Sequence, residues 1–274
     1  MSIEFSVIIP TYRRPRELLD AVSSALSQVE VTVEIAVVDD SPEGSAREVV
    51  ETINDRRVAY LKNPHPTGGI PSVVRNLAWP SAKGTFVHFL DDDDIVPDGH
   101  YAAVRDAFSK HPEVGIVFGR IEPFGNCPAA QLEHERRYFA NAARRAAKCS
   151  RFGSRWAFAG QMLFCDPLLV CSASVLRRDC IEQLDGFDPE IRLMEDAEFH
   201  LRAIRKFGVY FMDRVAVRYR IGTPSLMHSP NPSKSQLEFQ RAGRRQMRTK
   251  YRERRGILEY LMLALFARIL LNIV

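Results

Sequence analysis

The sequence predicts an α/β domain in which helices flank a Rossmann-like, mostly parallel β-sheet. Short apolar runs alternate with segments of helical periodicity over residues 1–120. The runs are of nearly continuous apolar character, which is typical of parallel strands covered by helices on both faces. Three of them end directly in polar clusters, and in such sheets ligands bind at the carboxyl ends of the strands. The pattern therefore predicts the fold class and the position of a site together.

The first half of the chain divides into strands and helices at clear boundaries. The apolar run 5–9 is closed by Pro10, and Pro15 opens a helix, where proline is tolerated at the first position. Apolar residues then recur at helical spacing up to about residue 28. The further elements expected in this half are strands at 33–38, 58–61, 86–90 and 114–118, and helices at 45–53, at 72–79 and from Pro97 onward.

The alternation stops after Gly119. Residues 133–155 are expected to form a basic helix, because they hold seven Lys and Arg against two Glu. A turn at Gly186-Phe187-Asp188 leads to a helix that begins near Glu195. The remaining expected elements are a late strand at 215–219, a basic helix at 234–255 and an apolar run at 257–274.

The composition excludes several classes of protein. The 274 residues carry 38 Lys and Arg against 34 Asp and Glu, and this net charge of +4 is too small to indicate a nucleic-acid partner. With 46% hydrophobic residues, the chain is too apolar to be disordered. Its five cysteines form no C-x-x-C pair, so reduced thiols in a cytoplasmic protein are expected. The first residues lack the basic segment of a signal peptide.

The polar clusters that follow three strands are the main functional signal. They are Thr11 to Arg14, Asp39-Asp40 and Asp91 to Asp94. Four adjacent carboxylates are not explained by packing, since carboxylates are almost never buried unpaired. A strand-end cluster of this kind suits Mg²⁺ or Mn²⁺, which bind a carboxylate or two together with substrate phosphates. The alternative is a solvated turn that caps the next helix.

Two further features are compatible with a nucleotide. Tyr12 could stack on a base while a strand-end aspartate accepts a hydrogen bond from it, although Asp39-Asp40 alone could equally form a turn. Gly68-Gly69 precede a helix whose first turns carry Arg75, which could reach a phosphate. The alternative for this segment is an ordinary flexible loop.

These segments occur in an order that resembles a known family. They are Ser6 to Tyr12, Val37 to Ser41, Gly68-Gly69 with Arg75-Asn76, and Gly84 to Asp94. Together they closely resemble the family 2 glycosyltransferases, which have the GT-A fold. The resemblance is dense over residues 4–120 and returns at Gly186-Phe187-Asp188 and at Glu195-Asp196. It implies a GT-A fold with a helical C-terminal extension, and transfer of a sugar from a nucleotide sugar.

The resemblance also implies roles for individual residues. Asp91 and Asp93 match its D-x-D motif and would bind Mn²⁺ or Mg²⁺, with Asp92 near the ribose. Asp196 matches the catalytic base, which an acceptor hydroxyl needs because it must lose a proton as it attacks. The residues expected to bind the nucleotide are Pro10, Thr11, Tyr12, Arg14, Asp40, Gly69, Arg75 and Asp92.

One position departs from the family pattern. Many members place a histidine shortly after a late strand that resembles Val217 to Arg220, where this chain has Gly222. The nearest histidine is His228. It is either a further metal ligand on a longer loop or a surface residue.

The function that these expectations describe is an inverting transfer. The donor would be a UDP- or dTDP-sugar, and the acceptor a glycan or a lipid-linked saccharide. Residues 1–120 would bind the nucleotide sugar, 121–233 the acceptor together with the base, and 234–274 would form the extension. The alternatives are a sugar nucleotidyltransferase and a non-catalytic, membrane-attached module that binds nucleotide or glycan.

The C-terminal extension joins a basic to an apolar segment. Residues 234–255 hold nine Lys and Arg against two Glu, and 257–274 are mostly apolar. Such a pair suits attachment to an anionic membrane, here the inner face of the plasma membrane. A helix that packs on the domain itself, or on a second subunit in a homodimer, explains the segment equally well.

Overall fold

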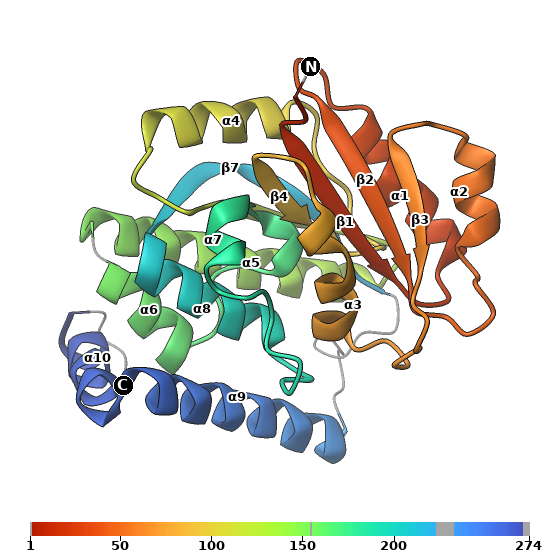
Figure 1. The fold of residues 1–274 in the computed structure, drawn as a ribbon. Coiled ribbons are helices and arrows are strands. Elements are labelled where there is room, and N and C mark those ends of the chain that lie inside the picture. The colour runs from red at the N-terminus through yellow and green to blue at the C-terminus, as the bar shows by residue number, and fades with distance from the viewer. Residues whose placement is uncertain (1, 154, 223–232, 271–274) are drawn as a thin grey trace.

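The computed structural model describes residues 2–153, 155–222 and 233–270 (Figure 1). The predictions for His228 and for the last four residues of the apolar run therefore lie outside the described residues.

The fold is built on one mixed sheet with the strand order β3-β2-β1-β4-β6-β5-β7. Within the described residues, β6 alone runs antiparallel to its neighbours, and the other strands are parallel to one another. The mostly parallel sheet predicted from the sequence is thus confirmed. The strands are β1 (Phe5–Thr11), β2 (Val33–Asp39), β3 (Val58–Lys62), β4 (Phe86–Phe89), β5 (Ile116–Phe124), β6 (Ser174–Arg177) and β7 (Val209–Arg220).

Helices cover both faces of this sheet. Consecutive residues of β1 enter different cores: Val7 and Ile9 belong to one, and Ile8 belongs to the other. This explains why apolar side chains stand in a row from Val7 to Ile9 instead of alternating with polar ones. The helices are α1 (Pro15–Leu26), α2 (Arg47–Ile53), α3 (Pro71–Ala78), α4 (His100–Lys110), α5 (Ala129–Arg151), α6 (Arg155–Phe164), α7 (Arg178–Glu182), α8 (Glu195–Phe207), α9 (Lys234–Arg255) and α10 (Ile257–Leu270), with short 3₁₀ turns η1 (Trp79–Ser81) and η2 (Cys171–Ala173).

The elements expected in the first half are all present, with boundaries that shift by a few residues. The second half differs more. The basic helix expected at 133–155 is α5, which ends at Arg151, and a separate helix α6 begins at Arg155. The positions from Ala157 to Leu163 are all buried, so α6 has no polar face from which to recognise it. The central strand β6 has only four residues, and β7 begins at Val209 instead of 215.

Strand β7 bends around an irregularity in its pairing with β5. The register shifts on either side of Arg120. A side chain at Gly119 would place its Cβ 2.5 Å from the Arg214 carbonyl oxygen, so the bend depends on glycine there. Beyond it, Arg218 forms a bridge with Ile95. The strand therefore ends beside the Asp91–Asp94 segment, which places Arg220 at the site.

Helices α9 and α10 lie together along one side of the molecule, next to α6 and α8 (Figure 1). Leu263 and Ala267 of α10 are buried, and a Cβ at Gly160 of α6 would approach the Cβ of Ala267 to 3.3 Å. On its other face α10 exposes apolar side chains, among them Leu258 at 75% exposure. None of the described helices is long and apolar enough to cross a bilayer.

Candidate active site

A cleft of about 740 Å³ opens at the carboxyl ends of β1, β2 and β4. Every described residue that the sequence predicted for the site lines it. These are Pro10, Thr11, Tyr12, Arg14, Asp40, Gly69, Arg75, Asp91, Asp92, Asp93 and Asp196. The convergence follows from topology, since parallel strands bring the segments after them to one edge.

Tyr12 and Gly69 form one wall of the cleft. Gly69 has φ +89°, and a Cβ there would lie 3.6 Å from the Tyr12 ring, so ring and loop backbone are in contact. The loop is held by Asp40, whose Oδ1 accepts from Asn63 Nδ2 (2.6 Å) and the Thr67 backbone N–H (3.0 Å). Its Oδ2 accepts from the Thr67 hydroxyl (2.8 Å) and the Gly69 N–H (2.6 Å).

This bonding gives Asp40 a function that sequence reasoning did not foresee. A carboxylate has about four acceptor positions, and here four donors of the chain itself use them. Asp40 is fully buried. To accept a hydrogen bond from a base, it would have to release one of these donors. The role of Asp40 in fixing the 63–69 loop is therefore structural, and its contact with a base stays a prediction.

The aspartates after β4 are bound to the loop after β1. Asp92 accepts from the Thr11 hydroxyl (2.7 Å) and from Nη1 of Arg14 (3.1 Å), and the same nitrogen donates to Asp93 (2.6 Å). Burial raises the pKa of Asp92 to about 7 and also raises the pKa of Asp93. The ionised forms of Asp92 and Asp93 are therefore unfavourable in the cleft unless a cation in addition to Arg14 stabilises them.

The fourth aspartate has a different task. Asp94 is fully buried, and its Oδ1 accepts from the Arg220 backbone N–H (3.0 Å). Burial and the neighbouring carboxylates raise its pKa well above the usual range. Arg220 also donates from Nε to the Asp93 carbonyl oxygen (2.8 Å) and from Nη2 to Asp20 (2.8 Å). Asp94 and Arg220 therefore fasten the end of β7 to the strand-end carboxylates.

Arg75 lies between the two ends of the cleft. Its side chain is 3% exposed, and it donates from Nη2 to Asp91 (2.7 Å) and from Nη1 to Glu195 (2.8 Å). Both carboxylates hold its guanidinium in place, so it is not extended into open space. Its predicted approach to a diphosphate remains a prediction, but its bridging position is a new finding.

Asp196 stands at the start of α8. The preceding Met194 has φ +67°, a conformation unusual for a residue other than glycine, and it sets the direction in which the helix begins. Oδ1 of Asp196 accepts from the Ala197 N–H (2.7 Å). Burial, reinforced by the charge of Glu195, raises the pKa of Asp196 to about 7. A carboxylate with this pKa is suited to take a proton near neutral pH.

The acidic residues fit a divalent metal that is shared with a substrate. Over the described ranges, no three His, Cys, Asp or Glu side chains gather into a metal site of their own. Asp91 and Asp93 supply hard oxygen ligands at the cleft surface. Mg²⁺ and Mn²⁺ are commonly held by one or two carboxylates plus substrate phosphates. The residues present therefore match a metal–diphosphate complex and not a stand-alone metal centre.

The far part of the cleft contains residues that sequence reasoning did not single out. α5 contributes His134, Glu135, Tyr138 and Phe139, β7 contributes Tyr219, and α9 contributes Gln240 and Arg244. The signals for this wall were the basic helices expected at 133–155 and 234–255 and the late strand expected at 215–219. Which of their faces would meet the cleft depended on packing that a single sequence does not give.

A comparison of the whole sequence with family profiles decides the family. The profile described as "Glycosyl transferase family 2" matches residues 6–175. The chain is a family 2 glycosyltransferase. This family assignment replaces both alternatives, the sugar nucleotidyltransferase and the non-catalytic module.

Named relatives of this glycosyltransferase act on lipid-linked saccharides. The UDP-Glc:alpha-D-GlcNAc-diphosphoundecaprenol beta-1,3-glucosyltransferase WfaP of Escherichia coli is 36% identical over 89 residues, 32% of this chain. The GalNAc(5)-diNAcBac-PP-undecaprenol beta-1,3-glucosyltransferase of Campylobacter jejuni is 34% identical over 126 residues, 45% of this chain. The matches span 35% and 38% of those relatives' own lengths.

Solved structures confirm the GT-A fold of this glycosyltransferase. S. aureus TarS 1–349 in complex with UDP-GlcNAc superposes with a TM-score of 0.63 at 19% identity, over 91% of this chain and 67% of TarS. The mannosyltransferase PcManGT from Pyrobaculum calidifontis, in complex with GDP-Man and Mn²⁺, gives a TM-score of 0.58 at 17% identity, over 99% and 81% of the two chains. At these identities the likeness concerns the fold alone.

Proposed function

We propose that this glycosyltransferase moves a sugar from a UDP- or dTDP-sugar to a hydroxyl of a lipid-linked saccharide or glycan, with inversion at the anomeric carbon. Residues 1–120 bind the donor, 121–233 bind the acceptor and supply the base, and 234–274 form the extension. The proposal rests on one observation: Arg75 bonds Asp91 of the D-x-D segment with one nitrogen and Glu195, beside the candidate base, with another. The donor end and the base are thus adjacent.

The chemistry follows from the residues along the cleft. Asp196 accepts the proton of the acceptor hydroxyl as the oxygen forms a bond to the anomeric carbon. The bond from that carbon to the diphosphate breaks in the same step, and its electron pair leaves with the nucleoside diphosphate. A Mn²⁺ or Mg²⁺ ion held by Asp91 and Asp93 would neutralise the departing diphosphate. Arg14 and Arg75 add positive charge on the same side of the cleft.

Inversion at the anomeric carbon is supported by the donor and the product linkage for which a relative is named. The Escherichia coli relative is named for UDP-glucose, which carries its glucose in α linkage, and for a β-1,3 product. A single displacement accounts for this change of configuration, and it requires one base and no covalent intermediate. The product's anomeric configuration, read by NMR, tests the point. An α-linked product from an α-linked donor would reject single displacement.

The donor class is tested directly by binding. A thermal-shift screen should compare UDP-glucose, UDP-GlcNAc, dTDP-glucose and GDP-mannose, each with and without Mn²⁺. We expect stabilisation by a uridine or thymidine donor that grows when Mn²⁺ is added. Stabilisation by GDP-mannose alone would overturn the proposed preference for uracil or thymine as the nucleobase of the donor. It would leave the proposed transfer chemistry intact.

The acceptor is proposed to be membrane-borne, and the extension is proposed to touch the membrane. On α10 the exposed side chains Leu258, Leu261, Met262, Leu265 and Ile269 recur at helical spacing and form one apolar stripe. On α9, Arg241, Arg245 and Arg252 are exposed on a common face. An apolar stripe on α10 and exposed arginines on α9, which packs against α10, suit an interface of anionic lipid.

Flotation with vesicles tests this membrane contact. We expect the chain to float with vesicles rich in phosphatidylglycerol and not with phosphatidylcholine vesicles, and Leu258→Glu/Leu265→Glu to stay at the bottom. Equal binding to both vesicle types would reject the proposed contribution of the arginines to membrane binding. A chain that forms a stable dimer through α10, and does not float, would favour the homodimer instead.

A further inference from the structure

The segment 186–194 leads directly into the proposed base and is held from α3. Gly186 has φ +65°, and a Cβ there would lie 2.5 Å from Asn76 Oδ1, so the backbone passes close to α3. The Asn76 amide donates to the Phe187 carbonyl oxygen (2.8 Å) and accepts from the Phe187 N–H (3.0 Å). The Ser72 hydroxyl donates to the Ile191 carbonyl oxygen (3.2 Å).

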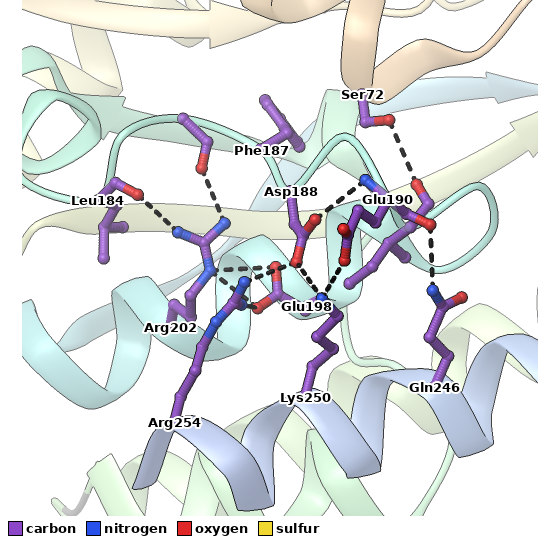
Figure 2. Close-up of polar contacts among 12 residues, drawn as sticks. Ser72, Leu184, Phe187, Asp188, Glu190, Glu198, Arg202, Gln246, Lys250 and Arg254 are labelled. Atoms are coloured by element: carbon purple, nitrogen blue, oxygen red, sulfur yellow. Dashed lines mark hydrogen bonds and ion pairs between the residues drawn. The ribbon is translucent and has the colours of Figure 1, made fainter.

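Helix α9 holds the same segment from the opposite side (Figure 2). Gln246 donates to the Glu190 carbonyl oxygen (3.0 Å). The ammonium of Lys250 pairs with the Glu190 carboxylate and lies 3.5 Å from the Asp188 carboxylate. A Cβ at Gly243 would lie 3.1 Å from the Leu193 carbonyl oxygen, so this part of α9 is packed directly on the segment.

Arg254 joins the segment to the helix that carries the base. Its Nη2 donates to Asp188 (2.6 Å), and its Nη1 donates to Glu198 of α8. Figure 2 shows the guanidinium reaching both carboxylates. Asp188 precedes Asp196 in the chain and Glu198 follows it by two residues. The Arg254 side chain therefore connects the segment before Asp196 to the helix after it.

The two carboxylates would not be left bare without Arg254. Glu198 also accepts from Arg202 Nε (2.8 Å), and Asp188 accepts from the Glu190 N–H (3.0 Å). Arg202 in turn donates to the carbonyl oxygens of Leu184 (2.8 Å) and Gly186 (2.7 Å). Loss of Arg254 therefore removes the bridge but avoids the large penalty of an unpaired buried charge.

We propose that Arg254 is a positioning residue for the transfer reaction: by tying Asp188 to Glu198 it fixes the turn that aims Asp196 at the acceptor hydroxyl. The inference rests on the proposed role of Asp196 as the base. It assigns to α9, in the C-terminal extension, a part in catalysis as well as in attachment. A small misplacement of a base is costly, because a proton moves efficiently only within hydrogen-bond reach.

The test uses the full chain and four variants. Arg254→Met removes the bridge, and Arg254→Lys keeps the charge but reaches one carboxylate at a time. Arg57→Met is the matched control, since Arg57 pairs with Asp55 at the amino end of β3, away from the cleft. Asp196→Asn reports on the base itself. The assay is UDP release from UDP-glucose with Mn²⁺ and a GlcNAc-diphospho-lipid, combined with amide hydrogen exchange.

For Arg254→Met we expect kcat to fall about 10- to 100-fold while the KM for UDP-glucose stays within about twofold. Amide exchange should accelerate over residues 186–196 and stay unchanged in β1 and β2. Arg254→Lys should recover part of kcat, and Arg57→Met should match the parent chain. Equal kcat for Arg254→Met and Arg57→Met overturns the proposal, as does a parallel loss of kcat and donor affinity with faster exchange throughout.

Failure of the proposed function would look different. If Asp196→Asn keeps its turnover, the proposed role of Asp196 as the base is wrong, and if the parent chain transfers no glucose, the proposed donor or acceptor is wrong. The exchange measurement still decides whether Arg254 holds the segment 186–196, because it needs no substrate. Unchanged exchange in Arg254→Met would then reject the bridge as well.

Discussion

Arg14 and Asp93 are joined directly, because Nη1 of Arg14 donates to Oδ2 of Asp93 across 2.6 Å. The same nitrogen donates to Asp92 across 3.1 Å. A side-chain cation therefore lies on the carboxylate to which the D-x-D motif assigns a metal ion. Arg14 adds positive charge to a site whose burial disfavours bare negative charge, and it would have to share Asp93 with any divalent cation that bound there.

Replacement of Arg14 should separate metal binding from donor binding. Arg14→Gln removes the cation that competes for Asp93, so Mn²⁺ alone should bind more tightly, by up to about tenfold. UDP-glucose should bind more weakly, because its diphosphate loses a positive neighbour. Calorimetry with Mn²⁺ and with UDP-glucose measures both, and Arg57→Gln, which loses an ion pair with Asp55 away from the cleft, is the control. Weaker Mn²⁺ binding by Arg14→Gln would contradict the competition.

Replacement of Asp93 should abolish the metal dependence of the reaction. In Asp93→Ala we expect Mn²⁺-dependent UDP release to fall to the level seen with a chelator, because a first ligand of the ion is lost. The measurement is UDP release with Mn²⁺ and with EDTA, for the parent and the variant. Activity of the parent chain that persists undiminished in EDTA would reject the metal role.

Replacement of the proposed base should spare donor binding. Asp196→Asn keeps the shape of the side chain but cannot accept the proton, so kcat should fall about 10²- to 10⁴-fold. The affinity for UDP-glucose, measured by calorimetry, should stay unchanged because Asp196 lies beside Glu195, at the end of the Arg75 bridge opposite to Asp91. Turnover within a few-fold of the parent would remove Asp196 as the base.

The pH profile should carry the signature of a carboxylate with a raised pKa. Burial raises the pKa of Asp196 to about 7, and only its ionised form accepts a proton. We therefore expect kcat to rise with pH, to reach half of its maximum near the pKa of Asp196, about 7, and to level off above that range. An Asp196→Asn variant with residual activity should lose this rise. A kcat that is flat between pH 5 and pH 8 would argue against a base in this environment.

The same burial predicts how stability changes with pH. The folded chain holds protons on Asp92 and Asp196 up to about pH 7, whereas an unfolded chain loses them near pH 4. The folded state therefore binds more protons between these values, and this contribution to stability falls as pH rises through them. Melting curves of Asp92→Asn should show a weaker pH dependence than those of the parent. An identical dependence would mean that Asp92 does not hold its proton.

The strands and the strand-end site could be predicted because both follow from local rules. Val7, Ile8 and Ile9 are apolar in a row since the two cores take alternate residues, and that pattern is visible without a structure. Chain order then places Asp40 and the Asp91–Asp94 segment at one edge. These inferences needed no knowledge of how distant segments pack.

The rest depended on contacts between distant segments. Arg75 and Glu195 are 120 residues apart, and Asp188 and Arg254 are 66 apart, so neither pair leaves a local pattern. β6 is too short, and α6 too uniformly buried, to show a period. Asp40 was predicted to bind the nucleotide, which stays a prediction, and the four donors that it does bind come from a loop whose path a single sequence does not give.

The bridge made by Arg75 also bears on the order in which substrates enter. Asp91, Glu195 and Arg75 carry formal charges of −1, −1 and +1, so the trio keeps one negative charge in a poorly solvated place. An incoming anionic donor is repelled by that surplus, whereas a divalent cation is attracted to it and reverses its sign. The enzyme should therefore follow an ordered kinetic scheme in which the metal ion arrives before or with the nucleotide sugar.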